Sequence, residues 1–104
     1  MGKTVIVTRH EGAIKWIRAK GFDGEVVAHI TEKDIESLKP GDIVIGVLPL
    51  QLIAEILSRG AEFILLSLPA VAFSDRGKEL SPEEMDKAGA KLYRVKSVQL
   101  EEVS

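Results

Sequence analysis

The chain has 104 residues, 45% of them hydrophobic, so we expect one domain over residues 1–104 with its own core. It has no cysteine, which excludes disulfides, thiolate metal sites and a cysteine nucleophile. Its net charge of −2 gives no general attraction for duplex DNA or RNA, so an anionic ligand needs a local cluster of positive groups. We find no apolar run long enough to span a bilayer and no leader resembling a signal peptide, and we therefore expect a cytoplasmic protein without a membrane partner.

The first segment with a clear pattern is a strand that ends in three polar residues. Thr4 to Val7 are all β-branched, which favours a strand that is covered on both faces. Thr8, Arg9 and His10 follow at its carboxyl end, where ligands bind in open α/β sheets and where the next helix turns its free N–H groups. A hydroxyl, a guanidinium and an imidazole in a row predict an oxyanion or phosphate site.

Strands and helices then alternate along the chain. After the strand over 4–7, the sequence predicts a helix over 11–20, a strand over 25–30, a helix from 31 to about 38, a strand over 43–48, a helix over 49–59, a strand over 62–66, a looser segment over 70–80, a helix over 81–88, an edge strand over 91–100 and a loose tail. This alternation predicts an α/β fold, a small Rossmann-like sandwich with a mostly parallel sheet of about five strands. The Gly-x-Gly-x-x-Gly and P-loop patterns are missing, which argues against a dinucleotide or NTP enzyme.

Capping residues mark several helix boundaries. Thr31 is a predicted N-cap, and Ser81 with Glu84 forms a predicted capping box. Pro49 suits the first position of a helix because it has no N–H to leave unpaired. In the helix that follows, the residues predicted to face the core are Leu50, Ile53, Ala54 and Leu57.

Three strand ends at the same sheet edge carry groups suited to an anion. Besides residues 8–10, these are Gly46-Val47-Leu48-Pro49 and Ser67-Leu68-Pro69. Gly46 lets the backbone approach a ligand closely, and the helix from Pro49 presents its positive end. Gln51 can offer an amide to a base or phosphate, and Arg76 can fold over the mouth of the site.

Structural explanations for these residues stay open. Arg9 can pair with Glu11, and His10 can cap the first helix. Gly46 can simply relieve crowding at a strand end, and Ser67 can cap a turn.

His29 and Trp16 are expected to be packing residues. His29 falls within the predicted second strand, and Trp16 lies on the apolar face of the first helix. The two histidines, which are far apart in sequence, leave little material for a metal site.

A longer motif, Val7-Thr8-Arg9-His10-Glu11-Gly12-Ala13-Ile14 followed by Trp16, runs from the first strand into the first helix. Together with Ala28-His29-Ile30, Gly46-Val47-Leu48-Pro49, Leu66-Ser67-Leu68 and Arg76-Gly77-Lys78-Glu79-Leu80, it resembles a family of small CRISPR-associated proteins that accompany type III systems. Members typically open with a strand, then Thr-Arg-His-Pro-Gly-Ala and a tryptophan. Glu11 stands where the family often has proline, which affects the entry into the first helix.

The resemblance implies a CARF-like version of the Rossmann-like fold and a role in cyclic oligoadenylate signalling. Type III effectors make rings of adenylates that activate defence nucleases, and proteins of this kind resemble ring nucleases that switch the signal off. The implied ligand is cyclic tetra-adenylate, bound in the cleft of a homodimer above the carboxyl edge of the sheet. The implied products are linear di-adenylates with a 2′,3′-cyclic phosphate, and no cofactor or metal is implied.

In this interpretation Arg9 and His10 are catalytic. Each ribose 2′-OH lies next to a phosphate, so cleavage needs alignment, charge stabilisation and proton transfer. Arg9 would stabilise the pentacoordinate phosphorane, and His10 would move a proton. The residues assigned to ligand binding are Thr8, Gly12, Gly46, Leu48, Pro49, Gln51, Ser67 and Arg76.

The sequence leaves two other functions open. The chain can bind the ring without cutting it, as a sponge or a sensor module. It can also be a protein-interaction domain that pairs with a partner through the edge strand predicted over 91–100.

Overall fold

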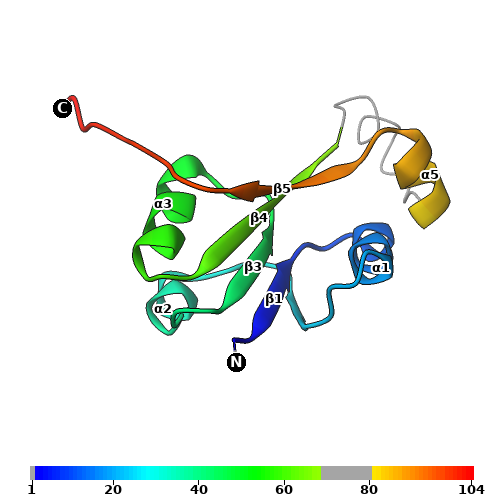
Figure 1. Ribbon diagram of the computed structural model, residues 1–104, viewed down its shortest axis with the longest axis horizontal. Helices are drawn as coiled ribbons and strands as arrows, with labels where there is room; N and C mark the ends of the chain where they lie inside the picture. Colours follow the sequence, from blue (N-terminus) through cyan, green and yellow to red (C-terminus); the bar gives the residue numbers. More distant parts are fainter. Residues whose placement is uncertain (1, 69–80) are drawn as a thin grey trace.

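The centre of the computed structural model, which describes residues 2–68 and 81–104, is one five-stranded sheet (Figure 1). Its strands are β1 (Thr4–Val7), β2 (Glu25–Val27), β3 (Ile43–Gly46), β4 (Glu62–Ser67) and β5 (Lys91–Val95), in the order β2-β1-β3-β4-β5. The first four strands are parallel, and β5 runs antiparallel to β4 at the sheet edge. The α/β sandwich with a mostly parallel sheet is therefore confirmed.

Helices cover both faces of the sheet (Figure 1). One layer contains α1 (Glu11–Ala19) and α5 (Pro82–Lys87), and the other contains α2 (Glu32–Glu36) and α3 (Leu50–Ser58). Successive side chains of β1 alternate between the two cores, because side chains of a strand point to opposite faces. Val5 and Val7 pack in the α2–α3 layer and Ile6 in the α1–α5 layer. Burial on both sides explains why this strand is β-branched throughout.

The path of the chain reverses between β1 and β3. After β1 the chain crosses through α1 to β2, and after β3 it crosses through α3, on the opposite face, to β4. The loops that leave β1 and β3 therefore diverge to opposite faces of the sheet. This divergence opens a crevice beyond the carboxyl ends of the two strands.

Asp42 joins the beginnings of three strands. It is buried, with 5% of its surface exposed, and its carboxylate accepts hydrogen bonds from the backbone N–H groups of Lys39 and Lys3, both at 2.9 Å. Its backbone carbonyl accepts from the N–H of Glu62 at 2.8 Å. The Lys39 N–H makes the largest contribution to lowering the pKa of Asp42, which burial alone would raise.

Trp16 links α1 to α5. The residue is 2% exposed, and its indole N–H donates to the Asp86 carboxylate at 2.7 Å. Lys20 pairs with the same carboxylate at 3.2 Å. The Trp16 bond and then the Lys20 bond lower the pKa of Asp86. The predicted packing role of Trp16 is confirmed.

The predicted helix starts are also largely confirmed. Thr31 caps α2, and Ser81 and Glu84 form the reciprocal capping box of α5. Pro49 differs from the prediction, because it is the N-cap of α3 and not its first helical residue. Leu50 was predicted to face the core, but it is 58% exposed at the first position of α3, which begins four residues after the end of β3.

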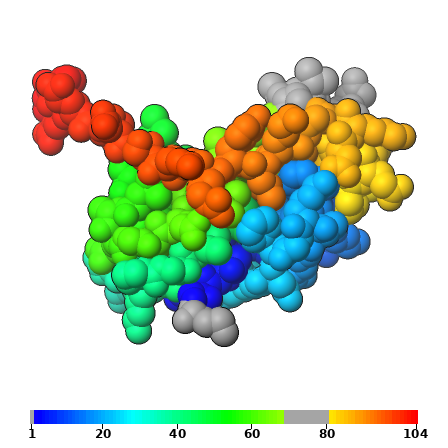
Figure 2. Space-filling model, in the orientation of Figure 1, coloured from blue at the N-terminus to red at the C-terminus, as the bar shows by residue number. Residues whose placement is uncertain are grey.

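Three strands are shorter than the sequence predicts. β2 ends at Val27, β3 at Gly46 and β5 at Val95. Residues 96–104 form no regular element. Val98 still packs against the core of the α2–α3 layer, and the C-terminal end then extends away from the body of the molecule (Figure 2). The predicted looser segment over 70–80 lies outside the described residues. In the described part of the chain, no helix is long and apolar enough to cross a membrane.

We expect Asp42→Asn to lower the free energy of unfolding by roughly 1–3 kcal/mol at pH 7, because the amide loses one of the two charge-assisted hydrogen bonds. The pKa of Asp42 is lowered by folding, so the contribution of the charged form is complete above the unfolded value of ~3.9 and disappears as the pH falls through the folded value. The difference between variant and wild type in urea unfolding should therefore shrink below about pH 4.

Asp23→Asn is the matched control, because the Asp23 side chain is 89% exposed and forms a surface ion pair with Arg18. We expect it to change stability by less than ~1 kcal/mol. Equal stability of Asp42→Asn and wild type at pH 7 would show that Asp42 does not hold the strand starts together.

Candidate functional site

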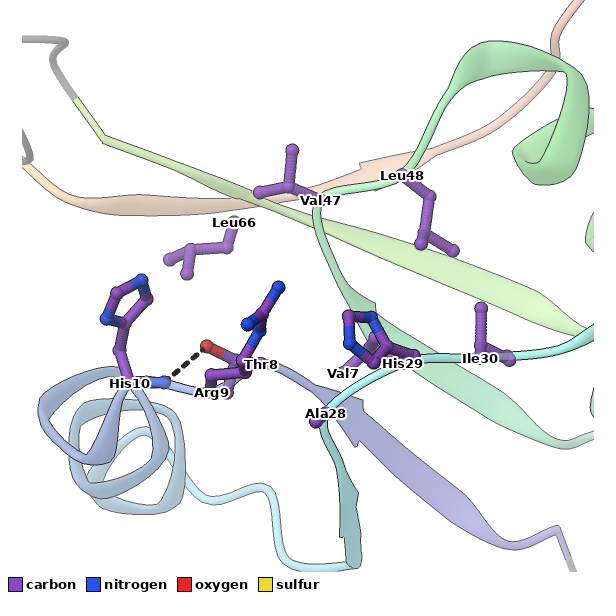
Figure 3. Close-up of a pocket in the computed structure, with 10 residues that line it drawn as sticks. All are labelled: Val7, Thr8, Arg9, His10, Ala28, His29, Ile30, Val47, Leu48 and Leu66. Carbon is purple, nitrogen blue, oxygen red and sulfur yellow. Dashed lines mark hydrogen bonds between the residues drawn. The ribbon is translucent and has the colours of Figure 1, made fainter.

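A cavity of about 530 Å³ opens where β1, β2 and β3 end (Figure 3). This volume is in the range of small-molecule sites in proteins, ~300–1,000 Å³. The cavity lies at the crevice between the diverging loops of β1 and β3, the place where ligands bind in open α/β sheets. Its lining residues are Val7, Thr8, Arg9, His10, Ala28, His29, Ile30, Val47, Leu48 and Leu66.

Two hydrogen bonds of Thr8 fix the turn that carries Arg9 and His10. The Thr8 N–H donates to the Val27 carbonyl at 3.0 Å, which continues the pairing of β1 with β2 by one residue. The Thr8 hydroxyl accepts from the His10 N–H at 3.1 Å (Figure 3). This bond closes a tight turn in which the Arg9 and His10 side chains are exposed at the cavity.

The structural explanations for Arg9 and His10 find no support in the described residues. His10 occupies the N-cap position of α1, but its side chain makes no capping hydrogen bond. Within the described part of the chain, Arg9 forms no ion pair with Glu11. Both residues line the cavity.

The charge of the described cavity lining is entirely basic or neutral. Arg9, His10 and His29 are its ionisable side chains, and the described lining contains no carboxylate. In Figure 3 the Arg9 side chain lies between the two imidazole rings. Apolar side chains make up most of the remaining lining. A guanidinium and two imidazoles, with no carboxylate in the described lining, favour an anionic ligand in this partly apolar cavity, although the whole chain is slightly acidic.

The structure brings only some of the predicted site residues into this cavity. Thr8, Arg9, His10 and Leu48 line it. Pro49 and Gln51 are exposed at the start of α3, and Ser67 lies at the end of β4 opposite Lys91. None of these three is part of the lining. The prediction for Arg76 falls outside the described residues.

Gly12 and Gly46 are buried and do not line the cavity. Gly12 lies in the first turn of α1. Gly46 pairs with Val7, and a Cβ atom on Gly46 would lie 2.6 Å from the Val7 carbonyl oxygen. Gly46 therefore allows β1 and β3 to approach each other at the floor of the crevice. This supports the structural explanation, in which Gly46 relieves crowding at a strand end.

The packing role expected for His29 is wrong. β2 ends two residues before His29, which lies exposed on the following loop and lines the cavity. The sequence signal was the change from the β-branched pair Val26-Val27 to Ala28-His29, which marks a strand end. The prediction continued the strand because Ile30 restores an apolar residue.

The described residues contain no group of three or more His, Cys, Asp or Glu side chains that could hold a metal ion. Fold and cavity together define a small doubly wound α/β protein with a basic pocket at the carboxyl edge of its sheet. Residues 5–98 match the family described as "Putative CRISPR-associated protein (Cas_VVA1548)". Because this match spans most of the chain, the protein belongs to that CRISPR-associated family. No curated protein and no solved structure matches the chain.

We expect Gly46→Ala to lower the free energy of unfolding by roughly 1–3 kcal/mol, because the added methyl group must push β1 and β3 apart. Thermal or urea unfolding measures this change. A variant as stable as the wild type would contradict the close approach of Gly46 to Val7.

Proposed function

We propose that this CRISPR-associated protein is a metal-independent ring nuclease that binds cyclic tetra-adenylate and cleaves it to linear di-adenylate with a 2′,3′-cyclic phosphate. This reaction would switch off type III CRISPR signalling. The observation that carries the proposal is the presence of Arg9 and His10 in one cavity at the crevice of a parallel sheet. The CRISPR-associated family of the chain supports the biological setting.

The proposed reaction uses a nucleophile that the substrate already contains. A ribose 2′ oxygen attacks the adjacent phosphorus, the O2′–P bond forms and the P–O5′ bond breaks. The attacking hydroxyl loses a proton and the leaving 5′ oxygen gains one. Arg9 can grip two phosphate oxygens with its planar guanidinium and stabilise the charge of the phosphorane. His10 can transfer a proton.

Apolar side chains around the basic groups suit the adenine bases. Leu48 and Ile30 line the cavity, and Val47 at its mouth is 61% exposed. Burying apolar surface of this kind against a base is favourable. An anion site with apolar walls therefore fits a nucleotide better than it fits inorganic phosphate.

We test the function by incubating the full chain with labelled cyclic tetra-adenylate in EDTA and separating the products by chromatography. The proposal predicts linear di-adenylate with a 2′,3′-cyclic phosphate. Tight binding of an intact ring would identify a sponge or a sensor module. No binding would favour an interaction domain that uses the outer edge of β5. Cleavage that stops in EDTA and returns with a divalent ion would reject the metal-independent mechanism.

We expect a homodimer in solution or upon addition of the ring. A ring of four nucleotides is larger than a typical small-molecule ligand, and a two-fold dimer presents two copies of Arg9 and His10 to a ligand that is itself symmetric. Sedimentation velocity with and without cyclic tetra-adenylate measures the state. A monomer under both conditions would refute the assembly.

Arg9→Ala should weaken binding and slow single-turnover cleavage together, because Arg9 holds the phosphate in the ground state and in the transition state. Arg9→Lys should rescue both only in part, because lysine keeps the charge but loses the planar fork. The matched control is Arg18→Ala, since Arg18 lies in the last turn of α1 and does not line the cavity. Equal effects at both positions would show that general surface charge, and not the cavity, binds the ring.

His10→Ala should leave binding within a few-fold of wild type and lower the single-turnover rate by roughly 10²–10⁴. Melting curves of the variant show whether the folded fraction has changed. If His10 serves only the fold, activity will fall no further than the amount of folded protein.

A further inference from the structure

His29 is held in the cavity by structure on both sides of it. The Val27 carbonyl before it accepts a hydrogen bond from Thr8, and the Ile30 side chain after it packs against the core of the α2–α3 layer. Thr31 then closes the loop by capping α2. His29 itself is exposed, and none of the described residues makes a hydrogen bond or an ion pair with its side chain. The loop is thus anchored while the imidazole is available to a ligand.

The two imidazoles of the cavity come from different loops. His10 follows β1 and His29 follows β2, and Figure 3 shows the Arg9 side chain between them. In a displacement at phosphorus, the attacking and leaving oxygens lie roughly in line on opposite sides of the phosphorus atom. A phosphate that Arg9 holds in this cavity can present one oxygen to each ring.

We propose that His29 is a second catalytic residue, which shares the two proton transfers of the cleavage with His10. This inference rests on the proposed function. One neutral imidazole takes the proton of the 2′-OH as the O2′–P bond forms. The other imidazole, in its protonated form, gives a proton to the 5′ oxygen as the P–O5′ bond breaks. The pair ends with its protonation states exchanged, and solvent water restores them.

The remaining described groups of the cavity do not offer an alternative proton carrier. The lining there contains no carboxylate, and the Thr8 hydroxyl already accepts a hydrogen bond from the backbone of the same turn. Arginine is not deprotonated in proteins and so cannot accept the proton of the 2′-OH. The cleavage needs a second proton carrier besides His10, and His29 is the described lining residue that can serve as one.

His29→Ala should bind cyclic tetra-adenylate within a few-fold of wild type and cleave it roughly 10²–10⁴ more slowly in a single turnover. The matched control is Glu32→Gln, because Glu32 is exposed, lies three residues further along and is not among the lining residues of the cavity. It should cleave at the wild-type rate. His29→Ala that cleaves at the wild-type rate, or loses activity only in proportion to folded protein, overturns the inference.

A ring with sulfur in place of each bridging 5′ oxygen identifies which proton each histidine moves. A thiolate leaves without being protonated, so cleavage of this ring needs no proton donor. One of the two variants, His10→Ala or His29→Ala, lacks that donor, and its cleavage rate on this ring should return to within about tenfold of the wild-type rate. The other variant should stay slow. If both variants respond equally to sulfur, the two residues do not divide the transfers and the inference fails.

The wild-type reaction separates this inference from the proposed function. Wild-type protein that leaves the normal ring intact rejects the ring nuclease and the role of His29 together. Wild-type cleavage combined with an unaffected His29→Ala variant rejects the role of His29 alone.

Discussion

The parallel pairing of β1 with both of its neighbours determines where the site lies. Val7 at the end of β1 is in register with Val27 of β2 and with Gly46 of β3, so the three strands end at one level. The missing side chain of Gly46 allows this close approach. The loops that follow then diverge to the two faces of the sheet and leave a cavity between them. The position of each basic group follows from this register.

The sequence predicted the architecture well because burial on both faces leaves a clear pattern. β1 is β-branched throughout, and Thr31 and Ser81 are strong helix N-caps. In both cases the local preference of the sequence agrees with the structure of the folded chain. Strand ends were less predictable. Ile30 looked like the continuation of β2, although its apolar side chain packs against the core from a loop. Periodicity reports that a residue is buried, but it does not report which element buries it.

Uncertainty about where strands end also limited the prediction of the cavity residues. The place of Thr8, Arg9 and His10 at the cavity could be predicted because they directly follow a recognisable strand, whose carboxyl end lies at the crevice of the sheet. His29 could not, because its place in the cavity depends on where β2 leaves the sheet. Gln51 and Ser67 also follow predicted strand ends, yet the structure leaves them outside the cavity. A position just after a strand end is therefore not enough to place a side chain in the cavity.

The central claim is that the basic cavity aligns the ring's own hydroxyl groups with its phosphates. The most direct measurement uses cyclic tetra-adenylate methylated on every 2′ oxygen, as a competitor and as a substrate. If the claim is right, this ring displaces the labelled parent ring from the wild-type protein, binds Arg9→Ala more weakly, and stays intact. Cleavage of the methylated ring at the rate of the parent ring would contradict the claim, because the nucleophile would then have to be water.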